Sequence, residues 1–469
     1  MIINPINYSS GGQISGVERN VTLTSGSVEA GDFVTIGDTI DLNKANYTMA
    51  NSGSIISHQL RKVHILSQTF DQSGNMESTT FLAVEKEKKG TGYIGFHMYT
   101  VDGDGNFELI SEYTSTINTN LTNTLDSVIL SSTSSNIYIA VFYEPFNFSA
   151  PGLRYTIYNY SVANKTYTEV KTAVLVDYLY SGVCCRVEKL TSSKLFLAFS
   201  GGQDTDSDTR NISGVICTYS TSTITANTKY VLNSNASKRV GTNFDIVKLS
   251  DTKVFITFGS YVSANDIYQL GGFVCTVSTN RITAETIQLV AGTTINKGYF
   301  IRAKLLSDGR VYITHLYDDP SDTHRYNLGA TFATISNTTV SFTGGRVLTT
   351  TYSGYFTPNA VEMPDNRMCI FHARGSGYAL YGCSTTINGT SYENTKDVML
   401  QNSSYSGNYP EAVKLSDKQI MVIHYGDSFV TYISLYTLDQ VTKCTGGIAS
   451  GVAKTDGGVG DEITVYMPE

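Results

Sequence analysis

The stretch Val247-Lys-Leu-Ser-Asp-Thr-Lys-Val-Phe-Ile-Thr-Phe258 carries the pattern that decides the fold. Alternating apolar residues precede and follow a Ser-Asp turn, which predicts two antiparallel strands joined as a hairpin. The same pattern returns along most of the chain, so the sequence predicts a repeat architecture. The other copies span residues 62–84, 128–140, 187–199, 303–315, 361–372 and 413–424.

Every copy has an apolar residue before the turn, and these residues, called anchors below, set the period of the repeat. Successive anchors are 52 to 64 residues apart, which leaves room for two more strands after each hairpin. Residues 271–277 and 282–289 form such a third and fourth strand in one unit. Seven units of four antiparallel strands predict a seven-bladed β-propeller. The anchors are Leu66, Leu130, Leu190, Leu249, Leu306, Met363 and Leu415.

Two alternatives to this architecture stay open from the sequence. A stack of β-sandwich repeats would use the same strands, but the units follow one another without linkers, which favours the propeller. Six or eight blades would result if the first unit, at 62–84, is misread. The last unit, at 409–440, has three strands and no clear fourth. We expect residues 45–60, which belong to no unit, to supply that strand and close the ring.

The two ends of the chain lie outside the repeat and resemble each other. Ala30-Gly-Asp-Phe-Val-Thr-Ile36 matches Val459-Gly-Asp-Glu-Ile-Thr-Val465, and both read as a Gly-Asp turn followed by a short strand. Neither end is long enough to bury a core alone. We therefore expect residues 1–44 and 441–469 to form one small β-barrel or sandwich module, into which an all-β propeller at 45–440 is inserted.

Composition excludes several classes of protein. Of 469 residues, 16% are charged, too few for a coiled coil, and 11% are aromatic, too many for a disordered chain. The net charge of −8 argues against a nucleic-acid partner. No apolar run reaches the length of a transmembrane helix, so we expect no membrane insertion. Residues 1–8 lack a secretory signal, which predicts assembly in a cytoplasm.

The C-terminal stretch from Lys443 to Pro468 contains a Gly-Ile-Ala strand and the Gly460-Asp461 turn, and it ends in a final strand. Together with Gly31-Asp32-Phe33-Val34, it resembles the small β-modules of tailed-bacteriophage tail-fibre and capsid-decoration proteins. This resemblance covers only the two ends of the chain and implies no catalytic residue. It implies a phage virion protein that is assembled in the host cytoplasm and has other virion proteins as partners. The terminal module would dock the chain onto the particle or form a homo-oligomer contact.

Aromatic side chains gather in two loops of the predicted propeller. No Trp is present, so a ligand surface would have to use Tyr and Phe. Exposed rings here would mark a contact surface, whereas buried rings would mark packing between blades, and the sequence leaves both readings open. The candidate ligand-binding residues are Tyr143, Phe146, Phe148, Tyr352, Tyr355 and Phe356.

Histidines end the second strand of three successive units, at His315, His372 and His424, where two earlier units have Phe199 and Phe258. They could form a shared ligand, metal or pH-sensitive site. The reading we favour is that His fills a slot of aromatic size and makes one hydrogen bond, because equivalent positions on different blades are separated.

Alternating acidic residues could bind calcium, and Asp204, Asp206 and Asp208 are weak candidates. We favour solvated turn residues, because no twelve-residue calcium loop with its distal Glu is present. No Cys-x-x-Cys pair occurs either. We therefore expect no metal site and no cofactor.

Sequence motifs of enzymes are missing, including Gly-x-Ser-x-Gly, a phosphate-binding loop and His-Glu-x-x-His. This leads to the expectation that the protein is not an enzyme. Its function is then receptor binding in host adsorption, with the propeller binding a host-surface ligand such as a carbohydrate. A structural capsid-decoration, baseplate or tail component is the first alternative. A glycan-cleaving propeller enzyme is the second.

Overall fold

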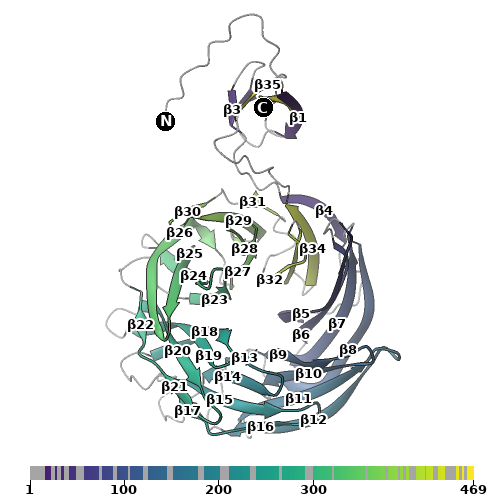
Figure 1. The fold of residues 1–469 in the computed structure, drawn as a ribbon, viewed down its shortest axis with the longest axis vertical. Coiled ribbons are helices and arrows are strands. Elements are labelled where there is room, and N and C mark those ends of the chain that lie inside the picture. The colour runs from purple at the N-terminus through teal and green to yellow at the C-terminus, as the bar shows by residue number, and fades with distance from the viewer. Residues whose placement is uncertain are drawn as a thin grey trace, which may run out of the picture. The chain divides into compact units, whose positions relative to one another are not determined.

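Figure 1 shows a computed structural model of the chain. No helix that could cross a membrane occurs among the residues that it describes. These residues are 16–22, 27–28, 33–35, 42–48, 58–72, 76–87, 92–103, 106–119, 125–144, 152–177, 184–200, 211–232, 239–262, 267–290, 299–319, 322–353, 357–364, 366–374, 379–388, 391–394, 398–400, 408–417, 419–425, 431–438, 450–453, 457–458 and 462–468.

The repeat units form antiparallel blades, numbered here in chain order. Blade 1 contains β5 (His58–Phe70), β6 (Met76–Glu87), β7 (Gly92–Asp102) and β8 (Phe107–Thr119). Blade 2 contains β9 (Asp126–Ser132), β10 (Asn136–Tyr143), β11 (Gly152–Ser161) and β12 (Thr166–Asp177). Blade 5 contains β23 (Tyr299–Leu305), β24 (Val311–Asp319), β25 (Asp322–Ser336) and β26 (Thr339–Ser353).

Blades 3, 4 and 6 have a fourth strand in two short pieces, both paired with the third strand. Blade 3 contains β13 (Cys185–Lys189), β14 (Lys194–Ser200), β15 (Ile212–Tyr219), β16 (Ile224–Ala226) and β17 (Tyr230–Val231). Blade 4 contains β18 (Arg239–Ser250), β19 (Lys253–Val262), β20 (Ile267–Val277), β21 (Ile282–Ala284) and β22 (Gln288–Leu289). Blade 6 contains β27 (Asn359–Met363), β28 (Arg367–Arg374), β29 (Ala379–Asn388), β30 (Ser391–Asn394) and β31 (Val398–Met399).

Blade 7 takes its fourth strand from the other end of the propeller sequence. It contains β32 (Asn408–Lys414), β33 (Gln419–Tyr425) and β34 (Thr431–Leu438), and β4 (Leu42–Thr48) pairs antiparallel with β34. The prediction that the segment before blade 1 closes the ring is confirmed, although β4 begins three residues before the predicted start at residue 45. Closure of this kind leaves no blade without its outer strand.

The first strand of each blade lies at the centre of the propeller. Figure 1 shows β5, β9, β13, β18, β23, β27 and β32 around the middle of the ring. Each of these inner strands contacts the next, and β32 contacts β5, so the circle is closed. The fold is a seven-bladed β-propeller of four-stranded antiparallel blades, as the repeat predicted.

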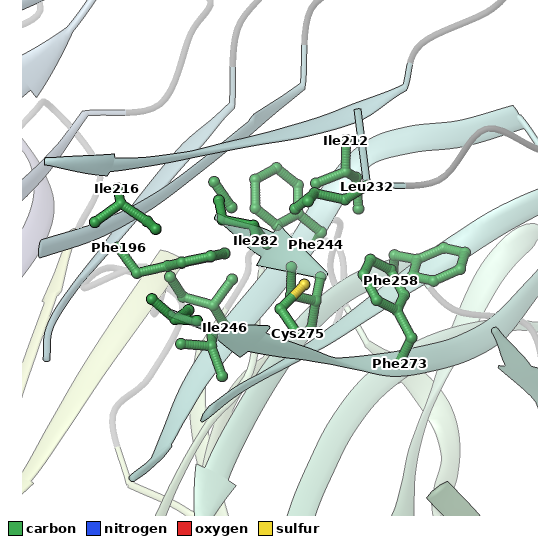
Figure 2. Close-up of a cluster of buried hydrophobic side chains, with 14 of the residues drawn as sticks. Phe196, Ile212, Ile216, Leu232, Phe244, Ile246, Phe258, Phe273, Cys275 and Ile282 are labelled. Carbon is green, nitrogen blue, oxygen red and sulfur yellow. The ribbon is translucent and has the colours of Figure 1, made fainter. Parts of the chain in front are cut away.

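The core of the propeller consists of apolar layers between neighbouring blades. Figure 2 shows the layer between blades 3 and 4, where Phe196 and Ile216 of blade 3 share one cluster with Ile246, Phe273 and Cys275 of blade 4. A blade buries both faces because a neighbour covers each of them. Each fully buried side chain of this size contributes about 1.5–3 kcal/mol relative to exposure, so stacking supplies most of the stabilisation.

Polar side chains next to the anchors tie blades 3, 4 and 6 to the blade before each of them. Lys189 Nζ donates to the carbonyl oxygen of Leu130 at 2.8 Å, and Lys248 Nζ donates to that of Leu190. Both lysines stand one residue before an anchor, and each reaches the anchor of the preceding blade. Glu362 stands in the same position of blade 6 and accepts the Ser307 N–H of blade 5 at 2.9 Å. Neighbouring blades are thus held in register near their turns.

Residues 1–41 and 439–469 form a second compact unit, and residues 42–438 form the propeller unit. Strands from the two chain ends share one sheet with the order β1-β37-β35-β3, and β2 pairs with β36. The two Gly-Asp segments that resemble each other in sequence precede β3 and β37, which both belong to this sheet. These strands are β1 (Gly16–Thr22), β2 (Ser27–Val28), β3 (Phe33–Thr35), β35 (Ser450–Ala453), β36 (Gly457–Gly458) and β37 (Glu462–Pro468).

Candidate functional site

One polar residue from every blade faces the centre of the propeller, and together these residues are called the central ring. Each stands four residues before the anchor of its blade, so the repeat places all of them at the same level. They line one cavity of about 200 Å³, to which all seven blades contribute. The ring consists of Lys62, Asp126, Arg186, Asp245, Arg302, Asn359 and Glu411.

The inner strands explain why a polar side chain is needed at this level. An inner strand pairs with its own blade along one edge only, so backbone groups on its other edge need partners from elsewhere. Asp126 supplies one, because its Oδ2 accepts the Val187 N–H of blade 3 at 2.8 Å. Asp245 makes the equivalent bond, accepting the Ala303 N–H of blade 5 at 2.9 Å.

Cations of the ring hold these carboxylates from the other side. Lys62 Nζ lies 3.0 Å from Asp126 Oδ1, and Arg186 Nε lies 3.1 Å from Asp245 Oδ1. The carboxylate side chains are only 6% and 9% exposed, so they require such partners. A cation of blade 1 therefore pairs with an anion of blade 2, and a cation of blade 3 with an anion of blade 4.

The alternation of charge breaks at blade 6, where the ring has an amide. Asn359 Nδ2 donates to Glu411 Oε2 at 3.0 Å. Arg302 of blade 5 reaches the same oxygen across this position, with Nη2 at 3.5 Å. This contact is longer than the other two ion pairs, and the buried Nε of Arg302 has no hydrogen-bond partner among the described residues.

The cavity moves the pKa values of its carboxyl groups apart. Burial alone would raise the pKa of Asp126, but Lys62 and Arg186 outweigh burial and hold that pKa below its ordinary value. Burial raises the pKa of Glu411 in spite of Arg302. Burial, together with Asp126 and Asp245, raises the pKa of Glu188 to about 7, although Lys62 opposes this. The same cavity thus holds one carboxylate that ionises readily and another that keeps its proton close to neutral pH.

The sequence contains a signal for the central ring that our sequence analysis missed. The position four residues before the anchor is charged or an amide in all seven units, whereas the flanking positions vary between apolar and polar. The signal is hidden because the residue type and the sign of the charge change from unit to unit. Only an alignment of the units on their anchors reveals it.

The three predicted histidines lie at equivalent places but do not form one site. His315, His372 and His424 are all buried, and each lies on the second strand of its own blade, opposite the third strand. The His315 ring lies over Gly329, where an added Cβ would meet it at 3.0 Å. None of the three lines the central cavity. In the described part of the chain, no three His, Cys, Asp or Glu side chains gather in a way that could hold a metal ion.

The aromatic and acidic candidates have different outcomes. Tyr143 is only 2% exposed, and it lies in the apolar layer between blades 1 and 2, where its hydroxyl is 3.1 Å from Thr156 Oγ1. It therefore belongs to blade packing, one of the two readings left open for its loop. Tyr352 lies on β26. The other candidates fall outside the described residues, namely Phe146, Phe148, Tyr355, Phe356, Asp204, Asp206 and Asp208.

Comparison with known proteins relates the chain to propellers of solved structure. No family model and no curated protein matches it in sequence. The BP39L lectin from Burkholderia pseudomallei matches over 81% of this chain and 96% of its own, with 11% identity and a TM-score of 0.52. The polysaccharide lyase Uly1 matches over 91% and 100%, with 12% identity and a TM-score of 0.47. An α-L-arabinofuranosidase from Fusarium graminearum, Arb93A, matches over 90% and 100%, with 11% identity and a TM-score of 0.42. At these identities the likeness concerns the fold.

The expectation that this protein is not an enzyme is corrected, because several similar propellers are named as glycosidases or as a polysaccharide lyase and a missing linear motif therefore does not exclude an enzyme. Linear motifs describe residues close together in sequence, whereas a propeller gathers residues from different blades. Asp126, Glu188, Asp245 and Glu411 come from four blades and line one cavity, and no motif search would group them.

The first prediction concerns the stability of the ring. Replacing Asp245 by Ala leaves Arg186 and the Ala303 N–H without their partner, so we expect the free energy of unfolding to fall by about 3 kcal/mol. Asp251→Ala is the matched control in the same blade, because Asp251 is 69% exposed and, among the described residues, forms an ion pair with Lys248 alone. That control should change stability by less than about 0.5 kcal/mol. Equal losses in the two variants, measured by denaturant unfolding, would contradict a structural role of the ring.

The second prediction concerns Glu188 and pH. The folded state keeps a proton on Glu188 up to about pH 7, whereas the unfolded carboxyl releases it near its ordinary pKa of 4.5. The stability from this group is therefore present below that ordinary value and is lost as the pH rises through 7. We expect the free energy of unfolding of E188Q, relative to the wild type, to increase from about pH 5 to about pH 8.

Denaturant titrations at several pH values provide this measurement. The matched control is E108Q, because Glu108 is exposed on the outer strand β8 and does not line the cavity. A stability difference for E188Q that stays constant or decreases with rising pH would contradict the raised pKa.

Proposed function

We propose that the propeller binds carbohydrate in its central cavity. One observation carries this proposal, namely that seven blades direct carboxylates, guanidinium and ammonium groups and an amide into one cavity of about 200 Å³. Such planar and charged groups form strong directional hydrogen bonds to hydroxyl groups, which a sugar presents on every side. The cavity is smaller than a typical drug-sized pocket, which suits one sugar residue of a longer glycan.

The likeness to BP39L supports this proposal, since that propeller is a lectin. Tyr312 supplies the only aromatic ring among the described lining residues, but this ring is 1% exposed and packs against Phe332, so the polar groups of the central ring would make the sugar contacts.

We further propose that the protein acts on a phage particle, where the propeller binds a glycan of the host surface. The resemblance of the segment from Lys443 to Pro468 to phage β-modules supports this part. In this proposal the terminal unit is a small β-barrel or sandwich that docks onto other virion proteins or joins copies of the chain. A purely architectural role in the capsid, baseplate or tail would use the same unit without any glycan.

Glycan cleavage in the same cavity is a second candidate function, and a specific observation favours it. Enzymes that hydrolyse glycosides use two carboxyl groups, one protonated and one ionised. The raised pKa of Glu188, with burial as its main cause, and the lowered pKa of Asp126 provide such a pair in one cavity. Glu188 would then be the proton donor.

The third prediction tests carbohydrate binding. We expect the full-length protein to bind at least one class of oligosaccharide on a glycan array. We expect N359A to lower the affinity by about tenfold, because the cavity loses an amide that can hydrogen-bond the sugar. N280A is the matched control, since Asn280 is exposed in a turn of blade 4 outside the cavity. Release of reducing ends from the bound glycan would select cleavage over binding alone, and absence of any glycan binding would refute the proposal.

The fourth prediction tests the virion role. A labelled antibody against the propeller should decorate intact particles of the phage that encodes the chain. Deletion of residues 439–469 removes three strands of the terminal sheets, so the truncated chain should no longer be incorporated. Unlabelled particles, or equal incorporation of the truncated chain, would contradict this part of the proposal. Neither result would affect the glycan measurements.

A further inference from the structure

Arg302 is the cation of the central ring that forms the weakest contacts with its neighbours. Lys62 and Arg186 each lie about 3 Å from a carboxylate that also accepts backbone N–H groups. Arg302 instead reaches Glu411 at 3.5 Å, on an oxygen that already accepts the Asn359 amide at 3.0 Å. The guanidinium of Arg302 can donate five hydrogen bonds, and its buried Nε has no partner among the described residues.

A second cation stands beside Arg302 on the same strand. Lys304 follows it by two residues on β23, so both side chains point to the same face of that strand. Both line the central cavity. Lys304 is exposed, and no described residue forms an ion pair with it. Arg302, Lys304 and Asn359 therefore form one corner of the cavity, called here the cationic corner, in which the Glu411 carboxylate contacts Arg302 and Asn359 and leaves further donors of Arg302 and the ammonium of Lys304 available.

The balance of charge in the rest of the cavity favours an anion at this corner. The lining residues include four cations and four acidic groups, so the cavity is neutral when all of them are ionised. Burial raises the pKa of Glu188 to about 7, so the cavity gains positive charge when Glu188 takes up its proton close to neutral pH. The whole chain carries a net charge of −8, and an anion would therefore be attracted by this corner and not by the surface in general.

We infer that the cationic corner binds the carboxylate of an acidic sugar. In this complex Arg302 forms a bidentate ion pair with the carboxylate, and the ammonium group of Lys304 contributes a second positive charge. This inference rests on the proposed carbohydrate function and names the class of sugar. A carboxylate matches the planar fork of Arg302 in geometry, which a neutral hydroxyl does not. Sialic acids and uronic acids both carry this group, and the ring does not separate the two.

The test is isothermal titration of the full-length protein with matched acidic and neutral sugars. The probes are 3′-sialyllactose against lactose, which differ by one carboxylated sugar, and trigalacturonic acid as the uronic example. We expect at least one acidic probe to bind about tenfold or more tightly than lactose, and the preference to shrink as salt is added. The acidic probe that binds identifies the source of the carboxylate.

Variants locate the preference in the cavity. R302Q should bring the acidic-to-neutral affinity ratio close to one, and R302K should restore only part of it, because an ammonium lacks the planar fork. K304Q should lower the ratio as well, and it replaces an exposed side chain, so the fold is expected to persist. K171Q is the matched control, since Lys171 is exposed on the outer strand β12 and its loss removes the same charge.

The outcomes separate this inference from the proposal on which it rests. Binding of lactose and the acidic probes with equal affinity, or an unchanged ratio in both R302Q and K304Q, would overturn the inference and leave carbohydrate binding in place. Failure of every sugar on the array and in the titrations would overturn both. A ratio that falls in R302Q and K304Q but not in K171Q would support the cationic corner.

Discussion

The closure of a circle by seven inner strands is the constraint on which the rest of the propeller depends. Each inner strand has one paired edge, so polar groups near the axis need partners from a neighbouring blade. The central ring meets this need with Asp126 and Asp245, each of which joins a backbone N–H of the next blade to a cation. Seven is an odd number, so charges cannot alternate in sign all the way round. Asn359 stands where the alternation fails, between Arg302 and Glu411.

This failure of alternation links stability to function. Where cations and anions pair closely, as for Arg186 and Asp245, the side chains are committed to holding blades together. Where the amide interrupts the sequence of charges, Arg302 lines the cavity and its Nε has no hydrogen-bond partner among the described residues. An odd number of blades thus produces one place where a ligand can complete the hydrogen bonds of the ring.

Much of the fold was predictable from the sequence, because blade packing repeats the same apolar pattern in every unit. The anchors gave the number of blades, and the missing fourth strand of the last unit indicated that a segment before the first unit closes the ring. The site was harder to predict. Tyr143 and the three histidines are large residues at loop ends or strand ends, and such positions in a propeller are buried between sheets. The central ring could not be predicted by residue type, because its members share a position in the repeat but differ in side chain. They come close together only when the seven blades close into a ring.

The central claim is that the ring both closes the propeller and forms its carbohydrate site. A crystal structure of the full-length protein with its tightest-binding oligosaccharide tests this claim most directly. The account predicts a sugar residue in the central cavity, with its polar groups within hydrogen-bond distance of Arg302 and Asn359 and the ion pairs of Asp126 and Asp245 intact. A sugar bound between outer strands or on the terminal unit, with the cavity unoccupied, would contradict it.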